Sequence, residues 1–254
     1  MDGFCGIDVA CAKRKRLPVA VVVRDGALLR SLPLRTKGPT PPRGMGNRRA
    51  LDSATCTEFA EQTAIYLASV ERAFDVTIRV VAIDAPRQPS QSARRVAELA
   101  MDQIGISCIP TPTERTFTDI RSKVAQHLAS GGLESHLPHA NQLWMLVGFE
   151  LFRRLGRVYE CIEVFPNAIV HAIAPGCPHK SKPEGFQRQL DAFATAARWN
   201  PQFLADAAHG SRHDRLDAIM SAWVASLPLP DRVAHGDGHL DTIWNVQPSY
   251  RHVV

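Results

Sequence analysis

The sequence predicts an α/β protein whose mixed five-stranded sheet is flanked by helices on both faces. Three apolar stretches of strand character follow one another between residues 4 and 34, which is the pattern of an antiparallel meander. Two further strand-like stretches, at 77–83 and 158–165, alternate with long segments of helical periodicity, as is typical of α/β architectures. The 254 residues contain no evident repeat or linker, so we expect one domain over residues 1–254.

The N-terminal meander is expected to lead into a basic loop. Its strands are predicted at residues 4–10, 17–23 and 27–34, with a hairpin turn between the second and the third. Residues 35–49 combine prolines and glycines with basic residues, and we therefore predict a mobile loop there.

Helices are expected to fill most of the remaining chain. Segments with a helical spacing of apolar residues lie at 55–74, 90–104, 114–129, 141–155 and 211–227. Shorter helices are expected after Asn167, before Arg198 and at 201–208. The tail from residue 228 is predicted to be rich in loops, with one weak strand at 242–246.

Composition and charge limit the class of protein. The net charge of +5 and several clusters of basic residues favour a polyanionic partner such as nucleic acid. The longest apolar runs, such as residues 17–23, are too short to cross a bilayer, and no leader precedes the first strand, so we expect neither membrane insertion nor secretion. The six cysteines are dispersed, which favours a reducing, cytoplasmic location.

Acidic residues stand at the ends of three predicted strands. Asp8 lies near the end of the first strand, Asp84 follows the strand at 77–83, and Glu163 lies near the end of the strand at 158–165. A carboxylate in a buried strand is costly unless it is paired or holds a metal ion. We expect these acids to meet at one edge of the sheet.

The last long predicted helix supplies a further carboxylate. Its apolar residues form one stripe, with Asp217 at the margin of that stripe and Asp214 one turn earlier. We expect Asp217 to converge with Asp8 and Asp84, and the fourth ligand is left open between Glu163 and Asp214.

Such a cluster of carboxylates predicts a metal-dependent reaction. Three or four carboxylates at one point repel one another and need divalent cations to coexist. Oxygen ligands select Mg²⁺ or Mn²⁺ over Zn²⁺. Two such ions on a basic surface are the usual apparatus for attack of water on a phosphodiester. The sequence therefore predicts a nuclease, with the choice between DNA and RNA left open.

Four short motifs resemble the DUF429 family. They are residues 6–10 (GIDVA), 82–86 (AIDAP), 163–166 (EVFP) and 216–223 (LDAIMSAW). Members of this family are described as predicted nucleases with a ribonuclease H-like fold, so the resemblance implies that fold and that activity. The predicted order of meander, helix, strand, helices, strand and final helix also resembles the core of that fold. The spacing of Asp214 and Asp217 is similar to the final helix of Holliday-junction resolvases.

The resemblance also implies roles for the acids. Asp8 would bind both ions, Asp84 one and Asp217 the other. The superfamily's ribonucleases place a further glutamate on the first helix. The candidates for this corner of the site are Glu58, Glu61 and, alternatively, Glu163. Because resolvase-like relatives are dimers, a homodimer is left open.

Basic residues in two clusters are candidate contacts to nucleic acid. Lys180, Lys182 and Arg188 belong to a segment that also looks like DUF429, and Lys13 and Arg14 follow the first strand. Contacts of this kind bind phosphate and raise affinity without selecting a base sequence. Solvated surface charge is the alternative interpretation of each cluster.

The acids have structural alternatives that we keep open. Asp214 lies three residues after Ser211, which is a capping-box spacing, and Glu163 can anchor the helix that follows it. Asp8 can accept a hydrogen bond from a backbone amide, and Asp84 can cap a turn.

Three other groups are candidates for a catalytic or metal-binding role. His213 is expected at a helix start, although such a group can protonate a leaving group in metal nucleases. Residues 235–239 (HGDGH) have the composition of a metal site, but their glycines favour a flexible turn. Cys11 lies close to Asp8, yet no histidine is placed by the sequence to activate it.

Two other functions compete with the nuclease. The first is a catalytically inactive nucleic-acid-binding or complex-forming protein on the same fold. The nuclease requires at least three of the four acids to lie within reach of a common ion, and the inactive protein does not. The second is a nucleotide-binding phosphotransferase of the actin and sugar-kinase type. That class needs two duplicated halves and glycine-rich phosphate loops, and the sequence has neither.

Overall fold

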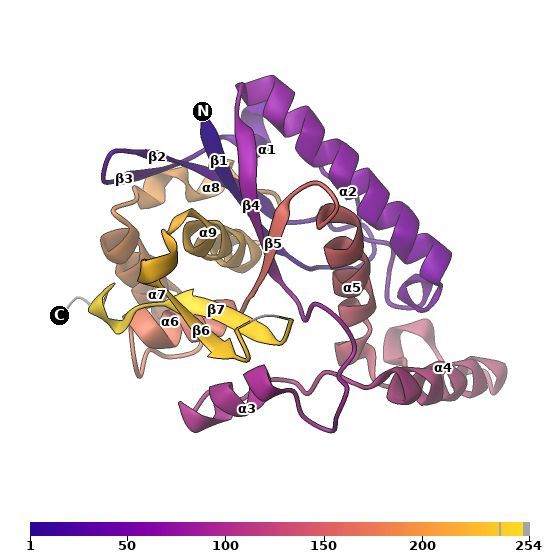
Figure 1. The fold of residues 1–254 in the computed structure, drawn as a ribbon. Helices are drawn as coiled ribbons and strands as arrows, with labels where there is room; N and C mark the ends of the chain where they lie inside the picture. Colours follow the sequence, from indigo (N-terminus) through magenta and orange to yellow (C-terminus); the bar gives the residue numbers. More distant parts are fainter. Residues whose placement is uncertain (239, 251–254) are drawn as a thin grey trace.

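A computed structural model describes residues 1–238 and 240–250, and within them the chain forms a mixed sheet in the order β3-β2-β1-β4-β5-β7-β6 (Figure 1). The strands are β1 (Asp2–Asp8), β2 (Val19–Asp25), β3 (Leu28–Ser31), β4 (Thr77–Asp84), β5 (Glu160–Val164), β6 (Arg232–Gly236) and β7 (Thr242–Val246). The pairs β1–β4, β4–β5 and β5–β7 are parallel, whereas the pairs β1–β2, β2–β3 and β6–β7 are antiparallel. The expected α/β architecture is confirmed.

The prediction of five strands was wrong, because the described residues form seven. The weak strand predicted at 242–246 coincides with β7, which pairs with β5 and so belongs to the main sheet. Strand β6 was not predicted at all. Its residues are all half-buried or exposed because it lies at the edge of the sheet, so it lacks the apolar alternation by which a strand is recognised.

The helices from residue 53 onward agree with the predicted segments to within a few residues, with one exception. The short first helix, at residues 34–37, lies where the end of a strand and a loop were predicted. The helices are α1 (Leu34–Lys37), α2 (Ser53–Phe74), α3 (Val96–Gln103), α4 (Glu114–Ala129), α5 (Trp144–Leu155), α6 (Pro166–Ile173), α7 (Pro183–Ala197), α8 (Leu204–Ala207) and α9 (Arg212–Ser226). The exception is α3, which begins six residues later than the helix predicted from residue 90. Ser90 instead forms a local turn, in which its hydroxyl donates to the carbonyl oxygen of Ser92 at 2.6 Å.

Helices cover both faces of the sheet, as predicted (Figure 1). Helices α2 and α5 pack on one face, against Cys5 and Ile7 of β1. Helices α6, α7 and α9 pack on the other face, against Val80 and Ala82 of β4. Side chains of a strand alternate between the two faces. Each strand residue near the edge of the sheet is therefore assigned to the α5 side or to the α9 side.

Gly6 sets the distance between β1 and α9. A Cβ atom added at Gly6 would lie within 3.0 Å of the carbonyl oxygen of Ala218 and of the amide nitrogen of Ala222. Helix backbone therefore rests directly on strand backbone, which only glycine permits. This contact places Asp217, the residue before Ala218, beside the end of β1.

The segment at 35–49 lies against the loop that follows β1. Its first residues belong to α1, and Gly44 donates its amide hydrogen to the carbonyl oxygen of Lys15 at 2.7 Å. Gly46 donates to the carbonyl oxygen of Cys11 at 2.7 Å. The predicted loop is thus a segment that is hydrogen-bonded to the loop that follows the strand carrying Asp8.

Two further findings concern the chain as a whole. None of the helices within residues 1–238 and 240–250 combines the length and the apolar character that a membrane span requires. The six cysteines, all in the described part of the chain, are free thiols.

Candidate functional site

Asp8 and Asp84 lie side by side at the carboxyl ends of β1 and β4. The two residues are direct partners in the parallel pairing of these strands. Asp84 follows Val80 and Ala82 at alternate positions, and these two residues pack on the α9 side. Gly6, two residues before Asp8, also faces α9. Both carboxylates are therefore directed to the side of the sheet that α9 covers.

Helix α9 and the loop before α7 complete this cluster. Asp217 of α9 is buried, with 5% of its surface exposed. Its Oδ2 atom accepts a hydrogen bond from the ammonium group of Lys180, while its Oδ1 atom accepts none from any residue that the structure describes. We call Asp8, Asp84, Asp217 and Lys180 the acid site. A cavity of about 220 Å³ opens on it and is lined by Asp84, Lys180 and Asp217, with His179 and Gln189.

Each of the three carboxyl groups of the acid site has a raised pKa. Burial, followed by the charges of Asp217 and Asp84, raises the pKa of Asp8 well above its ordinary value. Burial and the charge of Asp217 raise the pKa of Asp84 to about 8, against the opposing charge of Lys180. Burial also raises the pKa of Asp217, although Lys180 lowers it. A positive charge beyond that of Lys180 would therefore allow all three carboxylates to ionise.

The donor chemistry of the acid site fits a hard divalent cation. Its three carboxylates repel one another, and one buried carboxylate oxygen has no partner among the described residues. Carboxylate oxygens favour Mg²⁺ or Mn²⁺. Within residues 1–238 and 240–250, however, no three His, Cys, Asp or Glu side chains are gathered closely enough to hold an ion as they stand. The ammonium group of Lys180 is hydrogen-bonded to Oδ2 of Asp217, one of the oxygens that an ion would use.

Asp84→Asn is expected to stabilise the protein increasingly as the pH rises. Because the pKa of Asp84 is about 8 in the folded chain and near 3.8 when unfolded, the folded state retains a proton between these values that the unfolded state releases. Unfolding free energy therefore falls with rising pH in wild type, and asparagine removes this dependence. The stability gap should widen by about 2–4 kcal/mol from pH 5 to pH 8.

Thermal unfolding in a chelator measures this gap. The histidines with lowered pKa, such as His213, act with the opposite sign but are common to both proteins and cancel. Asp119→Asn, at an exposed position of α4, is the control and should show no widening. A gap that is equal at pH 5 and pH 8 would mean that Asp84 titrates like an exposed acid.

Glu163 is directed away from the acid site. Its neighbours in the sheet are Ile83 and Ile243, and Cys161, two residues earlier, packs on the α5 side. Glu163 therefore lies on the opposite face from Asp8. Its Oε1 and Oε2 atoms accept hydrogen bonds from Arg95, each at 2.8 Å. As a metal ligand Glu163 remains a prediction, but in this structure it is a partner of arginine.

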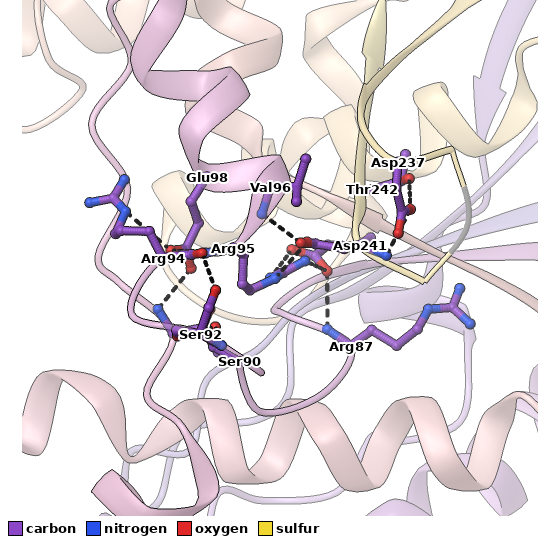
Figure 2. Close-up of polar contacts among 12 residues, drawn as sticks. Arg87, Ser90, Ser92, Arg94, Arg95, Val96, Glu98, Asp237, Asp241 and Thr242 are labelled. Atoms are coloured by element: carbon purple, nitrogen blue, oxygen red, sulfur yellow. Dashed lines mark hydrogen bonds and ion pairs between the residues drawn. The ribbon is translucent and has the colours of Figure 1, made fainter.

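Arg95 is the centre of a buried network that fastens the sheet edge. Besides binding Glu163, it donates from Nε to Asp241 Oδ1 at 2.8 Å, and the other oxygen of Asp241 accepts from the amide of Val96 at 2.7 Å (Figure 2). Glu98 closes the helix start by accepting from the amides of Arg95 and Thr111. The network joins β5, α3 and the turn before β7. Its central residue, Arg95, belongs to the segment that follows Asp84 along the chain.

Arg95→Met is expected to destabilise the protein by about 3–5 kcal/mol, because the buried Glu163 would lose its charged partner and keep only the hydrogen bond from the amide of Arg87. Thermal or denaturant unfolding measures this change. Arg79→Met is the control, since Arg79 is exposed and pairs with Asp2 at the surface, and its effect should stay near about 1 kcal/mol or below, as for most exposed pairs. Adding Glu163→Leu to Arg95→Met should restore part of the loss. Equal effects of the two arginine substitutions would contradict this assignment.

Asp214 and His213 lie beside the acid site at the start of α9. Asp214 forms the capping box, in which its Oδ2 accepts from the amide of Ser211 at 2.8 Å and its own amide donates to the hydroxyl of Ser211 at 3.3 Å. Its charge still contributes to the raised pKa of Asp8. His213 packs on Phe186, with 5.2 Å between the ring centroids, and burial followed by the charge of Arg212 lowers its pKa.

The remaining candidates occupy other places. Glu61 forms an ion pair with Arg154, and Glu58 accepts from Gln62 at 3.1 Å. Cys11 donates to Asn47, and burial raises its pKa to about 11, so that it stays a thiol at neutral pH.

The motif at 235–239 is described only in part. His235 belongs to β6, and Asp237 accepts hydrogen bonds from the amide of Asp241 at 3.2 Å and from the hydroxyl of Thr242 at 3.3 Å (Figure 2). His239 lies outside the described residues. The described part of the motif forms the tight connection between β6 and β7.

The basic candidates divide into one residue of the acid site and four surface residues. Lys180 is largely buried and paired with Asp217, so it does not present a simple surface charge. Lys182 and Arg188 are exposed at the start and in the middle of α7. Lys13 and Arg14 line a separate cavity of about 420 Å³, together with Arg43 and Arg49.

Sequence reasoning missed the role of Arg95 and of the acids around it. The sequence pattern assigns no role to Arg94, Arg95 or Asp241. Nothing local distinguishes the buried Arg95 from its half-buried neighbour. The signal that was available is Glu98, three residues after Arg95, which marks a helix start at residue 96 rather than at residue 90.

The fold and the acid site define an α/β protein with half-buried carboxylates at the ends of two central parallel strands and a buried one on the helix that covers them. The chain belongs to the DUF429 family, described as a protein of unknown function, whose profile matches residues 6–238. The match contains every residue of the acid site and confirms the family resemblance. Among curated proteins and among solved structures, no match was found.

Proposed function

We propose that this protein is a metal-dependent nuclease that hydrolyses phosphodiester bonds in DNA or RNA. The observation that carries the proposal is the cluster of Asp8, Asp84 and Asp217, three carboxylates from distant parts of the chain whose pKa values are all raised. An arrangement that costs folding energy needs a compensating role, and binding of divalent cations is the role that carboxylates most directly provide.

The architecture supports the same proposal. The chain runs through a three-stranded meander, α2, β4, further helices and β5, and α9 then returns to β1 with its acid. This order resembles the ribonuclease H-like core that the family resemblance implied. In the proposal, the two additional strands β6 and β7 extend that core beyond β5.

The residues of the acid site would divide the work as follows. Asp8, Asp84 and Asp217 would hold Mg²⁺ or Mn²⁺, which when bound lowers the pKa of a water molecule and stabilises charge on the phosphate. Lys180 would leave Asp217 and place its ammonium group near a phosphate oxygen. His213, close enough to interact with the charges of Lys180 and Asp217, is positioned to give a proton to the leaving oxygen. Lys182 and Arg188 would bind flanking phosphates.

A cleavage assay tests the proposal. Labelled single-stranded, duplex and branched DNA and RNA are incubated with the protein in Mg²⁺, in Mn²⁺ or in chelator, and the products are separated under denaturing conditions. Cleavage of at least one substrate is expected with either ion and none with chelator. Asp217→Asn should abolish cleavage, and Asp119→Asn should not. A folded protein that binds Mn²⁺ and cuts no substrate would contradict the nuclease assignment.

One observation favours the alternative of an inactive nucleic-acid-binding protein. Lys180 already neutralises part of the acid site, and no group of side chains in the described ranges is ready to hold an ion. An ammonium group in this place can stabilise the cluster without any metal. This alternative expects nucleic-acid binding that is unchanged by chelator, so the same assay with a binding readout separates the two functions.

A further inference from the structure

A second cavity adjoins the acid site across Asp84. It has a volume of about 210 Å³ and a mostly apolar wall, to which Trp144, Cys108 and Ile109 contribute. Glu163 and Trp144 both line it, so it lies toward the α5 side of the sheet edge. The proposed hydrolysis gives this cavity no role.

The two cavities share a wall. Asp84 and Phe165 line both the polar cavity at Lys180 and Asp217 and the apolar cavity at Trp144. A charged compartment and an apolar compartment therefore meet at one carboxylate and one aromatic ring. A nucleotide has the matching division into an anionic phosphate and a flat, largely apolar base.

We propose that the apolar cavity receives one unstacked nucleobase of the strand whose phosphate lies at the acid site. This inference rests on the proposed function and specifies its substrate class, which is single-stranded nucleic acid or a duplex with locally unpaired bases. A base within an intact duplex is stacked on both faces and cannot enter a side cavity without being extruded.

The size and the wall of the cavity suit a single base. The volume of 210 Å³ lies below the range of about 300–1,000 Å³ typical of sites for drug-sized ligands, so it accommodates one ring system and not an oligonucleotide. Trp144 donates its indole hydrogen to the carbonyl oxygen of Asn141 at 2.8 Å, which satisfies the polar edge of the ring. Its faces remain suited to stacking, which is the usual way proteins hold unpaired bases.

Glu98 gives the cavity a polar end. Its Oε1 atom accepts from the amide of Thr111 at 2.7 Å. Its Oε2 atom accepts from the amide of Arg95 at 3.3 Å and forms an ion pair with Arg94, also at 3.3 Å, so the carboxylate is fixed in place. A carboxylate has about four acceptor positions, and those left over can receive the exocyclic amino group of a base. The network around Arg95 thus holds an acceptor at the cavity as well as fastening the sheet edge.

Fluorescence anisotropy with labelled oligonucleotides of about ten nucleotides tests the inference, since sites for single strands span about 4–16 nucleotides. The single strand is compared with a blunt duplex of the same sequence, in Ca²⁺ so that phosphate can approach the acids. Trp144→Ala removes the stacking surface, and Trp144→Phe keeps an aromatic ring. Ile109→Trp fills the cavity from a side chain that is 46% exposed, and Ile65→Trp, on the outer face of α2, is its control.

Trp144→Ala and Ile109→Trp are each expected to weaken single-strand binding about tenfold, while Trp144→Phe and Ile65→Trp stay near wild type. Duplex binding should not change in any variant. Folded variants that bind the single strand like wild type would overturn the base site, whether or not cleavage is found. If the variants weaken binding but no substrate is cut, the base site stands and the nuclease proposal fails. If wild type binds no nucleic acid, both fail.

Discussion

Gly6→Ala should destabilise the protein by about 3 kcal/mol or more. The added Cβ would lie within 3.0 Å of two backbone atoms of α9, at Ala218 and Ala222. Backbone cannot yield as a flexible side chain does, so the whole helix must move away from β1, which places the cost at or above the upper end for overpacking. Asp217 would move with the helix, and the acid site would open.

Thermal unfolding of a matched pair of variants measures this effect. Gly3→Ala adds the same methyl group to the same strand, but its nearest neighbour would be a side-chain atom of Val21 at 3.4 Å, which is ordinary contact. We expect a small change for Gly3→Ala and a fall of about 6–12 °C in melting temperature for Gly6→Ala. Equal melting temperatures would mean that the close approach of α9 to β1 is not the feature that fixes Asp217.

Asp8→Asn should lower the rate of cleavage by about a thousandfold and at the same time stabilise the fold. The loss follows because Asp8 pairs with Asp84 in the sheet and interacts with Asp217, so it is the acid common to the whole site. Removal of interactions worth several kcal/mol in the transition state corresponds to about 10³ in rate. The gain in stability follows because one member of a mutually repelling cluster becomes neutral.

This combination distinguishes a lost ligand from a misfolded protein. Asp2→Asn is the control, because Asp2 lies in the same strand at its exposed end, where it pairs with Arg79. It should leave both cleavage and melting temperature close to wild type. Loss of cleavage together with a lower melting temperature in Asp8→Asn would instead make Asp8 a structural residue.

Much of the acid site could be predicted from the sequence because its members follow from simple periodicities. Asp8 and Asp84 each end an apolar strand, and strands that run parallel bring their carboxyl ends to one edge. Asp217 stands at the margin of an apolar helical stripe, which is a position that faces a neighbouring element without being central to the core. No long-range information was needed beyond the assumption that the last helix packs on the first strand.

The face of the sheet on which Glu163 lies could not be predicted in this way. Ending a strand fixes the edge of the sheet at which a side chain lies, but not the face, and the face depends on a register that is set by pairing between distant segments. Pairing of Glu163 with Ile83 places it on the α5 side, opposite Asp8. A shift of one residue would have reversed the outcome.

The basic residues and the edge strand were hard to predict for a related reason. Arg95 is buried only because Glu163 and Asp241 meet it from two other elements, and Lys180 enters the acid site only because its loop is placed over Asp217. Strand β6 exists because β7 offers it a free edge. Each of these features is created by tertiary contact, whereas local propensity describes only a residue's own segment.

Calorimetric titration of Mn²⁺ into the wild-type protein and into Asp8→Asn tests the central claim most directly. If Asp8, Asp84 and Asp217 form a divalent-ion site, wild type should bind one or two ions, and Asp8→Asn should bind fewer ions or bind them at least about tenfold more weakly. Absence of binding to the folded wild-type protein, even at millimolar Mn²⁺, would contradict the claim. Lys180 would then be the resident partner of the acids, and the protein would act on nucleic acid by binding alone.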